Sequence, residues 1–511
     1  QAWSLHVDNE SRLTGVPQLA LDHAREEAKL RDLDGWVFTL DIPSYRAILS
    51  NADDRELRAE MYQARTTRAS DQGPHDPKWD NTDLILEILK LRQEAAQLLG
   101  YPNYVEMSLA KKMAPDADTV MNFLQELIDK AKPVAQRELD DLQAFAQPDL
   151  GEPLQAWDIG YYAEKLKEQR LQFDDEALRP YFQLDKVMAT MFDIAEKLFG
   201  VSISETEPVN RWHDDVKLYR VVDEQNNERG QFYVDLYTRK KKRGGAWMDS
   251  CFGRIDIGDQ KQQPITYLNC NFMPANEGKP ALLTHGDVET LFHEFGHNLH
   301  GLLTKVDYPS IAGTNGVAWD AVELPSQFME NFIWQPEVLR QMSSHYETGE
   351  PLPEDKIEGL LKSRVFHSGM HVTRQLSFGW LDLQLHLNSI DNDSLNQIVH
   401  DSITNTSVTP VPDFNRFANA FNHIFEGGYA AGYYSYLWAD VLAADAYSAF
   451  QENGLLDKDT GRKFLHEILE VGGSREAMDA FKAFRGREPK PDALLRQLAL
   501  VDAADDSTIG I

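Results

Sequence analysis

Apolar residues recur at steps of three and four through most of the first third of the chain. This spacing is typical of amphipathic helices, because it brings the apolar side chains onto one face. It predicts helices near residues 17–32, 43–51, 53–69, 82–100, 102–113, 116–146, 157–171 and 183–199. One short strand is predicted at 36–41. Nothing in this part indicates chemistry, so it is predicted to be helical scaffold.

The pattern then changes to an alternation of apolar and polar residues. Period two over 216–223 and 231–239 predicts two strands, and the turn-rich residues 225–230 between them predict a hairpin. A third strand is predicted at 265–272. An exposed strand edge can hold an extended peptide by main-chain hydrogen bonds. The alternative is a purely structural hairpin, and periodicity does not separate the two.

Helical spacing returns most clearly over residues 284–303. The apolar face comprises Val288, Leu291, Phe292, Phe295, Leu299, Leu302 and Leu303. Thr284 is the predicted N-cap, with Asp287 at the acidic third position. Gly296 costs ~1 kcal/mol relative to Ala in a helix interior, which indicates that another segment packs closely there. Later helices are predicted at 326–334, twice within 355–400, and at 460–485 and 490–500, with a connecting loop at 404–413.

The polar face of this helix carries the pattern H-E-x-x-H, formed by His293, Glu294 and His297. Residues four apart lie one above the other, so the two imidazoles can bind one metal ion. Glu294 lies beside that position, where a general base must be to deprotonate a water molecule. The alternative is a buried helix with two hydrogen-bonded histidines. The metzincin extension is excluded, because it needs Gly at 300 and His at 303, where this chain has His300 and Leu303.

A third metal ligand is expected downstream, where the candidates are Glu323, Glu330 and Glu337. Glu323 lies in the apolar segment Ala-Val-Glu-Leu-Pro, where a lone carboxylate is costly unless it is paired or bound to a metal. We therefore assign Glu323 to the metal and expect the other two to be helix-surface acids. Glu330 and Gln327 share the face of Glu323, so they either support the ligands or face solvent. Asp320 is a second candidate for orienting a ligand histidine.

These residues carry a resemblance to a known family. The segments His-Glu-Phe-Gly-His at 293–297, Ala-Gly-Thr at 312–314 and Asp-Ala-Val-Glu-Leu-Pro-Ser-Gln at 320–327 resemble the thimet oligopeptidase family of zinc peptidases. The resemblance covers nearly all of the chain. Family members are longer at the N-terminus, and this chain begins at Gln1 without Met, so we expect a shortened form that lacks part of the zinc-bearing lobe.

The resemblance implies a mainly α-helical, neurolysin-like zincin fold with two lobes, a deep substrate channel and a small sheet beside the active site. One lobe is expected at 169–370, with the zinc helix and the sheet. The other is expected at 1–168 plus 371–511. The resemblance also favours a substrate-binding role for the strand at 265–272. One Zn²⁺ per chain is implied, bound by His293, His297 and Glu323.

A second stretch of interest, residues 421–438, combines three glycines with four tyrosines. Glycine permits unusual backbone angles, and a phenol or imidazole can stabilise the negative charge that builds on a peptide carbonyl during attack. By spacing, Tyr429, Tyr433 and Tyr436 would share one helical face, for which an aromatic core stripe is the alternative explanation. The resemblance implies that Tyr433 and His423 hold the oxyanion. It implies substrate contacts for Tyr429, Tyr436, Gly427 and Gly428.

Composition narrows the possible partners. A formal net charge of −31 disfavours nucleic acid. No apolar run of ~18 residues is present, so no membrane partner is expected. Two cysteines, Cys251 and Cys270, give no disulfide framework and fit a reducing compartment. We expect a cytoplasmic monomer acting on short peptides.

The function expected from residues and resemblance together is that of a zinc metalloendopeptidase, an oligopeptidase in which Glu294 assists the attack of water on an internal peptide bond. Two alternatives stay open. One is a dipeptidyl carboxypeptidase of the same family, and the other is a peptide-binding fragment without turnover.

Overall fold

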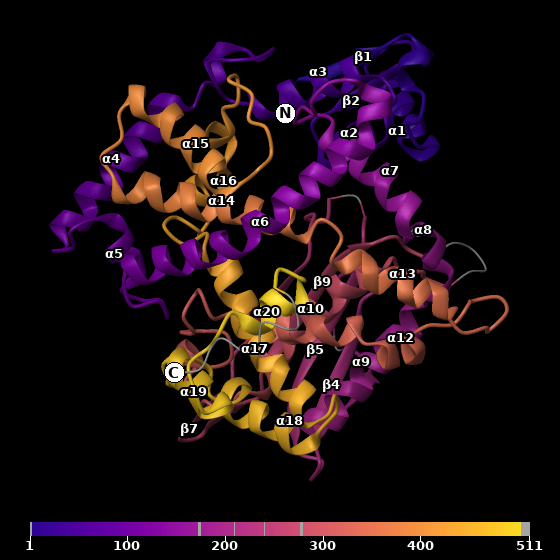
Figure 1. The fold of residues 1–511 in the computed structure, drawn as a ribbon. Coiled ribbons are helices and arrows are strands. Elements are labelled where there is room, and N and C mark those ends of the chain that lie inside the picture. The colour runs from indigo at the N-terminus through magenta and orange to yellow at the C-terminus, as the bar shows by residue number, and fades with distance from the viewer. Residues whose placement is uncertain (1–2, 172–174, 209, 240, 276–279, 502–511) are drawn as a thin grey trace. The chain divides into compact units, whose positions relative to one another are not determined.

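The computed structural model describes residues 3–171, 175–208, 210–239, 241–275 and 280–501 (Figure 1). The fold is mainly helical, with one small sheet, as the sequence predicts. The chain forms two compact units. The first unit comprises Gln1–Ala110, Ala114–Gln172 and Val365–Tyr434. The second unit comprises Lys111–Met113, Phe173–Arg364 and Ser435–Ile511.

The first unit is built almost entirely from helices. They are α1 (Gln18–Lys29), α2 (Ile42–Asn51), α3 (Arg55–Thr66), α4 (Thr82–Leu98), α5 (Tyr104–Leu109), α6 (Ala117–Leu150), α7 (Ile159–Leu171), α14 (Ser368–Leu387), α15 (Asn392–Thr406) and α16 (Asn422–Phe425). A two-stranded ladder joins β1 (Ser4–Val7) to β2 (Trp36–Thr39). The long helices α6 and α14 pack together at Gly369, where a Cβ would lie 2.6 Å from the backbone nitrogen of Ala135.

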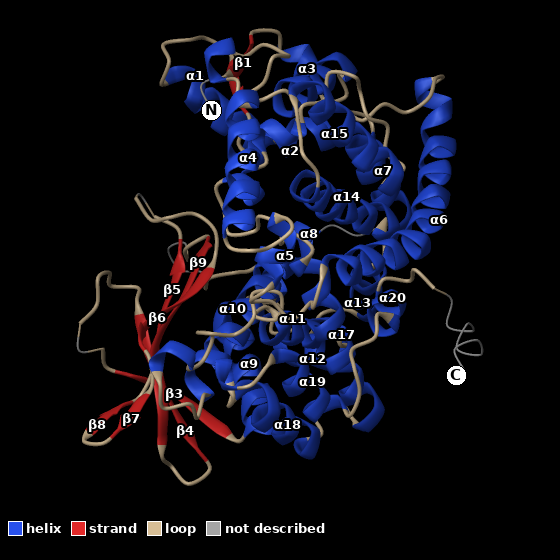
Figure 2. Cartoon of the chain, turned by 90° about the vertical axis from the view of Figure 1, so that its left-hand side faces the viewer, coloured by secondary structure: helices blue, strands red, loops and turns tan. Residues whose placement is uncertain are grey.

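The second unit contains the sheet, which Figure 2 shows in red. Its strands run in the order β3-β4-β5-β9-β6. They are β3 (Val201–Thr206), β4 (Lys217–Asp223), β5 (Glu228–Tyr237), β6 (Trp247–Phe252) and β9 (Ile265–Phe272). A separate hairpin joins β7 (Ile255–Ile257) to β8 (Gln260–Gln262). β4 and β5 form the predicted antiparallel hairpin, β9 runs parallel to β5, and β6 is an antiparallel edge strand.

Helices cover one face of this sheet. The helices of the second unit are α8 (Asp175–Leu178), α9 (Leu184–Phe199), α10 (His285–Leu303), α11 (Leu324–Glu330), α12 (Pro336–Met342), α13 (Glu354–Arg364), α17 (Ser435–Asn453), α18 (Lys458–Phe464), α19 (Ala477–Arg485) and α20 (Asp492–Gln497). The rings of Phe192 on α9 and Phe295 on α10 meet the ring of Phe232 on β5, with centroids 6.3 and 6.2 Å away. α10 is thereby fixed against the sheet.

The C-terminal segment packs with α11. Phe328 on α11 lies 5.2 Å from Phe450 on α17 and 4.2 Å from Phe464 on α18, between ring centroids. The division expected from the sequence joins 371–511 to the other lobe, whereas these aromatic contacts place 435–501 in the second unit. Residues 502–511 lie outside the described residues.

Several boundaries differ from the predictions. β3 and β6 are strands that the sequence analysis did not predict. β6, with the sequence Trp-Met-Asp-Ser-Cys-Phe, shows no alternation of apolar and polar residues, whereas β3 begins with a short one, Val-Ser-Ile-Ser. Three helices, α13, α14 and α15, occupy the region expected to hold two. The helix predicted at 460–485 is divided between α18 and α19. Gly472, at φ +48°, lies in the break, where a Cβ would meet the backbone of residues 311 and 313.

No helix in the described part of the chain is long and apolar enough to cross a membrane.

The predicted close packing at Gly296 is confirmed, and it gives the first testable prediction. A Cβ at Gly296 would lie 2.6 Å from Cα of Ser326 and 2.8 Å from the carbonyl carbon of Pro325, both backbone atoms of α11. We expect Gly296→Ala to push α10 from α11 and lower the free energy of unfolding by about 1–3 kcal/mol, measured by thermal or urea unfolding.

Gly286→Ala, on the same helix, is the matched control. The nearest atom to its Cβ is Oγ1 of Thr284 at 3.9 Å, so the added methyl has room and improves helix propensity. Equal stability of the two variants would contradict the close approach of the two helices.

Candidate active site

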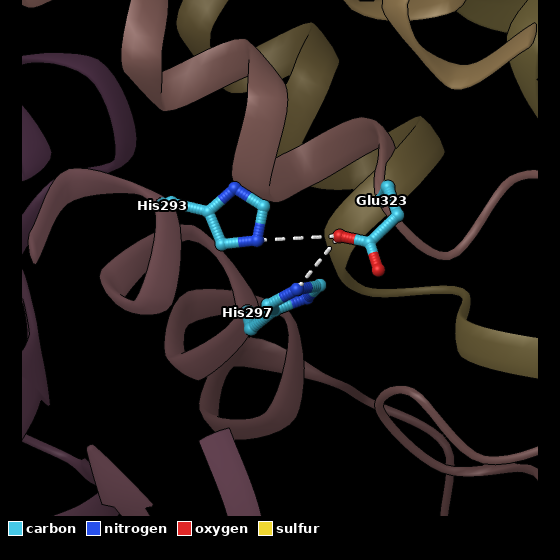
Figure 3. A group of neighbouring side chains, drawn as sticks. All are labelled: His293, His297 and Glu323. Carbon is cyan, nitrogen blue, oxygen red and sulfur yellow. Dashed lines mark ion pairs between the residues drawn. The ribbon is translucent and has the colours of Figure 1, made fainter. Parts of the chain in front are cut away.

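Helix α10 positions three of the predicted site residues. It begins with the predicted capping box, in which Thr284 accepts the backbone N–H of Asp287 at 3.0 Å and the Asp287 carboxylate accepts the N–H of Thr284 at 2.9 Å. His293 and His297 lie one turn apart, and their ring centroids are 4.9 Å apart. Figure 3 shows both rings turned toward the same carboxylate, that of Glu323.

Glu323 is the residue immediately before α11. Its Oε2 lies 3.4 Å from Nε2 of His293 and 2.9 Å from Nε2 of His297. Ser326 fixes the segment locally, since its hydroxyl donates to the Glu323 carbonyl at 2.8 Å and to Oε2 at 2.9 Å. The structure therefore brings together the two histidines and the one downstream glutamate that the sequence selected.

This donor set fits a metal ion. One atom from each of the three residues lies within 4.8 Å of the others. Ligands about 2.0–2.1 Å from a tetrahedral ion are separated from one another by about 3.3 Å, close to the two separations above. Two imidazole nitrogens with one carboxylate oxygen is also a donor set found in catalytic zinc sites. The three residues are thus a candidate metal site.

The charges in this group are strongly coupled. Burial alone would raise the pKa of Glu323, but hydrogen bonds from His293 and His297 outweigh it and hold that pKa far below its usual range. Burial alone would lower the pKa of His293, but its carboxylate partners Glu323 and Glu330 raise it well above normal. The carboxylates therefore raise the pKa of His293, and the two imidazoles lower the pKa of Glu323. The two carboxylates around His293 favour a bound cation at this position.

Glu330 is the residue that the sequence analysis expects at the helix surface, with support of the metal ligands as the alternative. Its Oε1 lies 2.5 Å from Nδ1 of His293. With Nδ1–H donating to this carboxylate, the lone pair of Nε2 points to the metal position. The expectation that Glu330 is a helix-surface acid is therefore wrong. The seven-residue spacing from Glu323 was the available signal, since it puts both on one face of a helix.

A further acid interacts electrostatically with this pair. Burial raises the pKa of Asp440, on α17, to about 8, and the negative charge of Glu330 adds to the shift. Burial and this negative charge therefore favour the protonated form of Asp440. Its helix is distant in sequence, so no local pattern indicated it.

Glu294 is buried, with 5% of its surface exposed. Burial raises the pKa of its carboxyl above the usual value, while the nearby histidines and the backbone amide of Met248 oppose the shift. Its Oε2 has no hydrogen-bond partner among the described residues. Met248 belongs to edge strand β6, so the edge of the sheet lies beside the candidate base. Sequence reasoning missed this strand.

Two other predicted supporting residues have different contacts. Asp320 is fully buried, and its Oδ1 accepts the backbone N–H of Met113 at 2.7 Å. The side-chain oxygen of Gln327 has no partner among the described residues.

β9, the strand favoured for substrate binding, is paired on both sides by β5 and β6. That assignment is corrected, because an inner strand has no free edge. In the part of the chain that the structure describes, β6 pairs with β9 alone and so is the edge strand on this side.

The second predicted stretch lies mostly in the first unit. The rings of His423 and Tyr433 are 5.7 Å apart and those of His423 and Tyr429 are 6.3 Å apart. Tyr433 is buried, whereas His423, Gly427 and Gly428 are exposed.

The tyrosines of this stretch do not share a helical face. Residues 426–434 form consecutive turns, and α17 begins only at Ser435. Tyr436 falls in the first turn of α17, in the second unit. The expected common face is therefore wrong, because glycines at 427, 428 and 432 favour turns over a helix.

An H-E-x-x-H helix met by a carboxylate from a following segment defines the class of this protein, a metallopeptidase. Residues 48–500 match the model of peptidase family M3, and the chain belongs to that family. Over 502 residues it is 48% identical to oligopeptidase A of Escherichia coli (strain K12), a match that spans 98% of this chain and 74% of the relative.

More distant relatives agree with this family. The chain is 32% identical over 507 residues to dipeptidyl carboxypeptidase of Escherichia coli (strain K12), spanning 97% of this chain and 73% of the relative. The solved structure of PZ peptidase A with inhibitor 2 is similar with a TM-score of 0.53 at 16% identity, spanning 96% of this chain and 77% of that one. This last likeness concerns the fold.

The contact of Glu330 with His293 predicts a loss of metal affinity when the carboxylate is removed. We expect Glu330→Gln to bind a divalent metal roughly 10–100-fold more weakly, because the imidazole loses the partner that orients it. Titration against a chromophoric chelator measures the affinity. Glu337→Gln, an exposed acid on α12, is the control and should bind as the unmodified chain does. Unchanged affinity in Glu330→Gln would contradict the orienting role.

A pH dependence of stability follows from His285, at the start of α10. Burial lowers its pKa to about 4, against a smaller opposing effect of the hydrogen bond to the Ile333 carbonyl. Below about pH 6.5 the imidazole of His285 binds a proton in the unfolded chain but not in the folded chain, where it is buried. Stability therefore falls as the pH drops from about 6.5 to about 4, by up to about 3 kcal/mol from this residue.

Urea unfolding across this pH range, with chelator present throughout, measures the effect. His285→Phe keeps an aromatic ring against Trp334, whose centroid is 4.4 Å away, and should reduce the loss of stability toward acid. Some loss remains, because burial also lowers the pKa values of His300 and His367. His23→Gln, at an exposed position on α1, should leave it unchanged. The same acid sensitivity in His285→Phe would refute the assignment.

Proposed function

We propose that the chain is a zinc-dependent endopeptidase that hydrolyses internal bonds of short peptides, with one Zn²⁺ per chain. The observation that supports this best is the convergence of His293, His297 and Glu323 beside the buried carboxyl of Glu294. Membership of family M3 and the similarity to oligopeptidase A support the substrate class.

Zinc held by these three ligands would act as a Lewis acid that polarises the peptide carbonyl and lowers the pKa of a water molecule. Glu294 accepts the proton that the attacking water loses and passes it to the leaving amine. The raised pKa of Glu294 suits this exchange, because it brings the proton affinity of the carboxylate closer to what a base needs at neutral pH.

In the structure the single hydroxyl proton of Tyr433 is donated to Oε1 of Gln375, and during the reaction it turns to the substrate. Tyr433 and His423 then donate hydrogen bonds to the carbonyl oxygen as negative charge develops on it. This assignment rests on the family resemblance of residues 421–438. Tyr429, Tyr436, Gly427 and Gly428 contact the substrate on the same grounds. The free edge of β6, beside Glu294, holds the peptide backbone in extended form, which requires no particular side chains and suits varied sequences.

The remaining assignments belong to the same proposal. The protein acts as a monomer in the cytoplasm, and the formal charge of −31 disfavours nucleic acid as a partner. The substrate channel and the lobe boundaries at 169–370 stay predictions from the resemblance.

The role of Glu294 gives the decisive experiment. We expect Glu294→Gln to lower kcat on a quenched fluorescent peptide by roughly 10²–10⁴-fold, because the amide cannot take up the proton. Metal content should stay at one ion per chain, since the three ligands are intact. Glu337→Gln is the control and should retain activity. Persistent turnover by Glu294→Gln would reject the mechanism, and absence of turnover in the unmodified chain would favour the peptide-binding alternative.

The dipeptidyl carboxypeptidase alternative is favoured by the 32% identical relative of that name. A peptide amidated at its C-terminus separates the two activities, because release of C-terminal dipeptides depends on recognition of the free carboxylate. Mass spectrometry of the products should show cleavage of internal bonds in both free and amidated forms. Cleavage of the free form alone, in steps of two residues, would replace the endopeptidase assignment.

A further inference from the structure

The turns that carry Tyr433 are fastened to a buried carboxylate on α14. Asp382 accepts the backbone N–H groups of Ala431, Gly432 and Tyr433 at 2.9, 2.8 and 2.9 Å. Its side chain is fully buried. Ala431 adopts φ +46°, in the left-handed region, so successive amides can point to one side. A buried carboxylate is stabilised by such donors, and its negative charge in turn holds the three N–H groups of the turn together.

The beginning of the same segment is held by Arg92 on α4. Its Nη1 donates to the carbonyl of Ile424 at 2.7 Å, and its Nη2 donates to the carbonyl of Phe425 at 3.3 Å. The same Nη1 lies 2.9 Å from Nε2 of His386.

His386 joins the two attachment points. Its Nδ1 lies 2.9 Å from Oδ1 of Asp382 and 2.8 Å from the Asp382 carbonyl. Because Arg92 can only donate, Nε2 of His386 must accept, so the imidazole is neutral with its proton on Nδ1. Arg92, His386 and Asp382 thus form one chain of hydrogen bonds beneath residues 424–433.

The side chain of Tyr433 is held by the same helix. Its hydroxyl donates to Oε1 of Gln375 at 3.0 Å. Gln375 precedes Asp382 by seven residues, or about two helical turns, so both face the same side of α14. The ring of Tyr433 also meets Phe378 edge to face, with centroids 5.6 Å apart. α14 therefore fixes both the backbone and the phenol of this residue.

We propose that Asp382 is a positioning residue for the peptidase reaction: it sets the backbone of residues 431–433 and thereby the place of the Tyr433 hydroxyl. This inference rests on the proposed function of Tyr433. Asn at 382 has nearly the same shape, but its single acceptor oxygen and lack of charge cannot hold three amides. The turn then relaxes, and the phenol moves from the position where it stabilises the oxyanion.

A double-mutant cycle on a quenched fluorescent peptide tests this. We expect Asp382→Asn to lower kcat by roughly 10–100-fold with a smaller change in KM, since misplacement of a catalytic group by about 1 Å has costs of this order. In the Tyr433→Phe background, Asp382→Asn should lower kcat less than about threefold, because the hydroxyl it positions is already gone. Metal affinity should be unchanged in every variant.

Asp158→Asn is the matched control. Asp158 is an equally buried carboxylate of the first unit, held by Arg55, Arg58 and the backbone N–H of Gln155. Its replacement should lower stability without a selective loss of kcat. If Asp382→Asn does not fold, His386→Gln provides the same cycle with a weaker expected effect, since an amide can replace only part of the link between Arg92 and Asp382.

Two outcomes overturn the inference. One is a wild-type kcat in folded Asp382→Asn. The other is a loss of kcat on Asp382→Asn that is equally large whether Tyr433 is intact or already replaced in the Tyr433→Phe background. Failure of the proposed function is distinguishable, because it shows as turnover that survives Glu294→Gln or as full activity of Tyr433→Phe alone.

Discussion

The site depends on one constraint, the close approach of α10 and the segment that begins α11. Two imidazoles on a single helix can offer only two ligands, and the third must come from another segment held at contact distance. Gly296 allows this approach because the backbone of Ser326 occupies the space where a side chain would be. The result is a partly buried group of two imidazoles and one carboxylate, His293, His297 and Glu323, which is costly to assemble and is better explained by a bound cation than by stability.

The surroundings of this group reinforce its polarity. Glu330 contacts Nδ1 of His293, and the negative charge of Glu330 helps to raise the pKa of Asp440. The raised pKa of Asp440 favours its neutral form, which reduces the repulsion between these acids. The sheet contributes differently, since β6 brings a backbone amide to Glu294 and pairs with β9 alone among the strands of the described residues. A base, a metal position and an open strand edge thus gather within one unit.

The first unit solves a separate problem, how to hold a glycine-rich segment in one arrangement. Glycines give the residues after α16 many accessible conformations, and a phenol on such a segment would be poorly placed without further restraint. Asp382 and Arg92 restrain it through its amides and carbonyls rather than its side chains. Backbone restraint of this kind fixes the path of the segment, and Gln375 holds the phenol of Tyr433 in addition.

The sequence by itself determined the elements with strong periodicity and the residues whose chemistry is local. The helix at 284–303, its capping box, the hairpin of β4 and β5, and the pair His293 and His297 all follow from spacing, because helix and strand geometry relate near neighbours in a fixed way. Glu323 was selected from its apolar setting.

Only the tertiary structure decided the contacts between segments distant along the chain. It placed β9 inside the sheet, with β6 at the edge, and brought the Glu330 carboxylate into contact with His293. It also assigned residues 435–501 to the second unit and brought Asp382 into hydrogen bonds with the turns before α17. Such contacts arise from packing and from the need of buried charges for partners, and local periodicity carries no information about either.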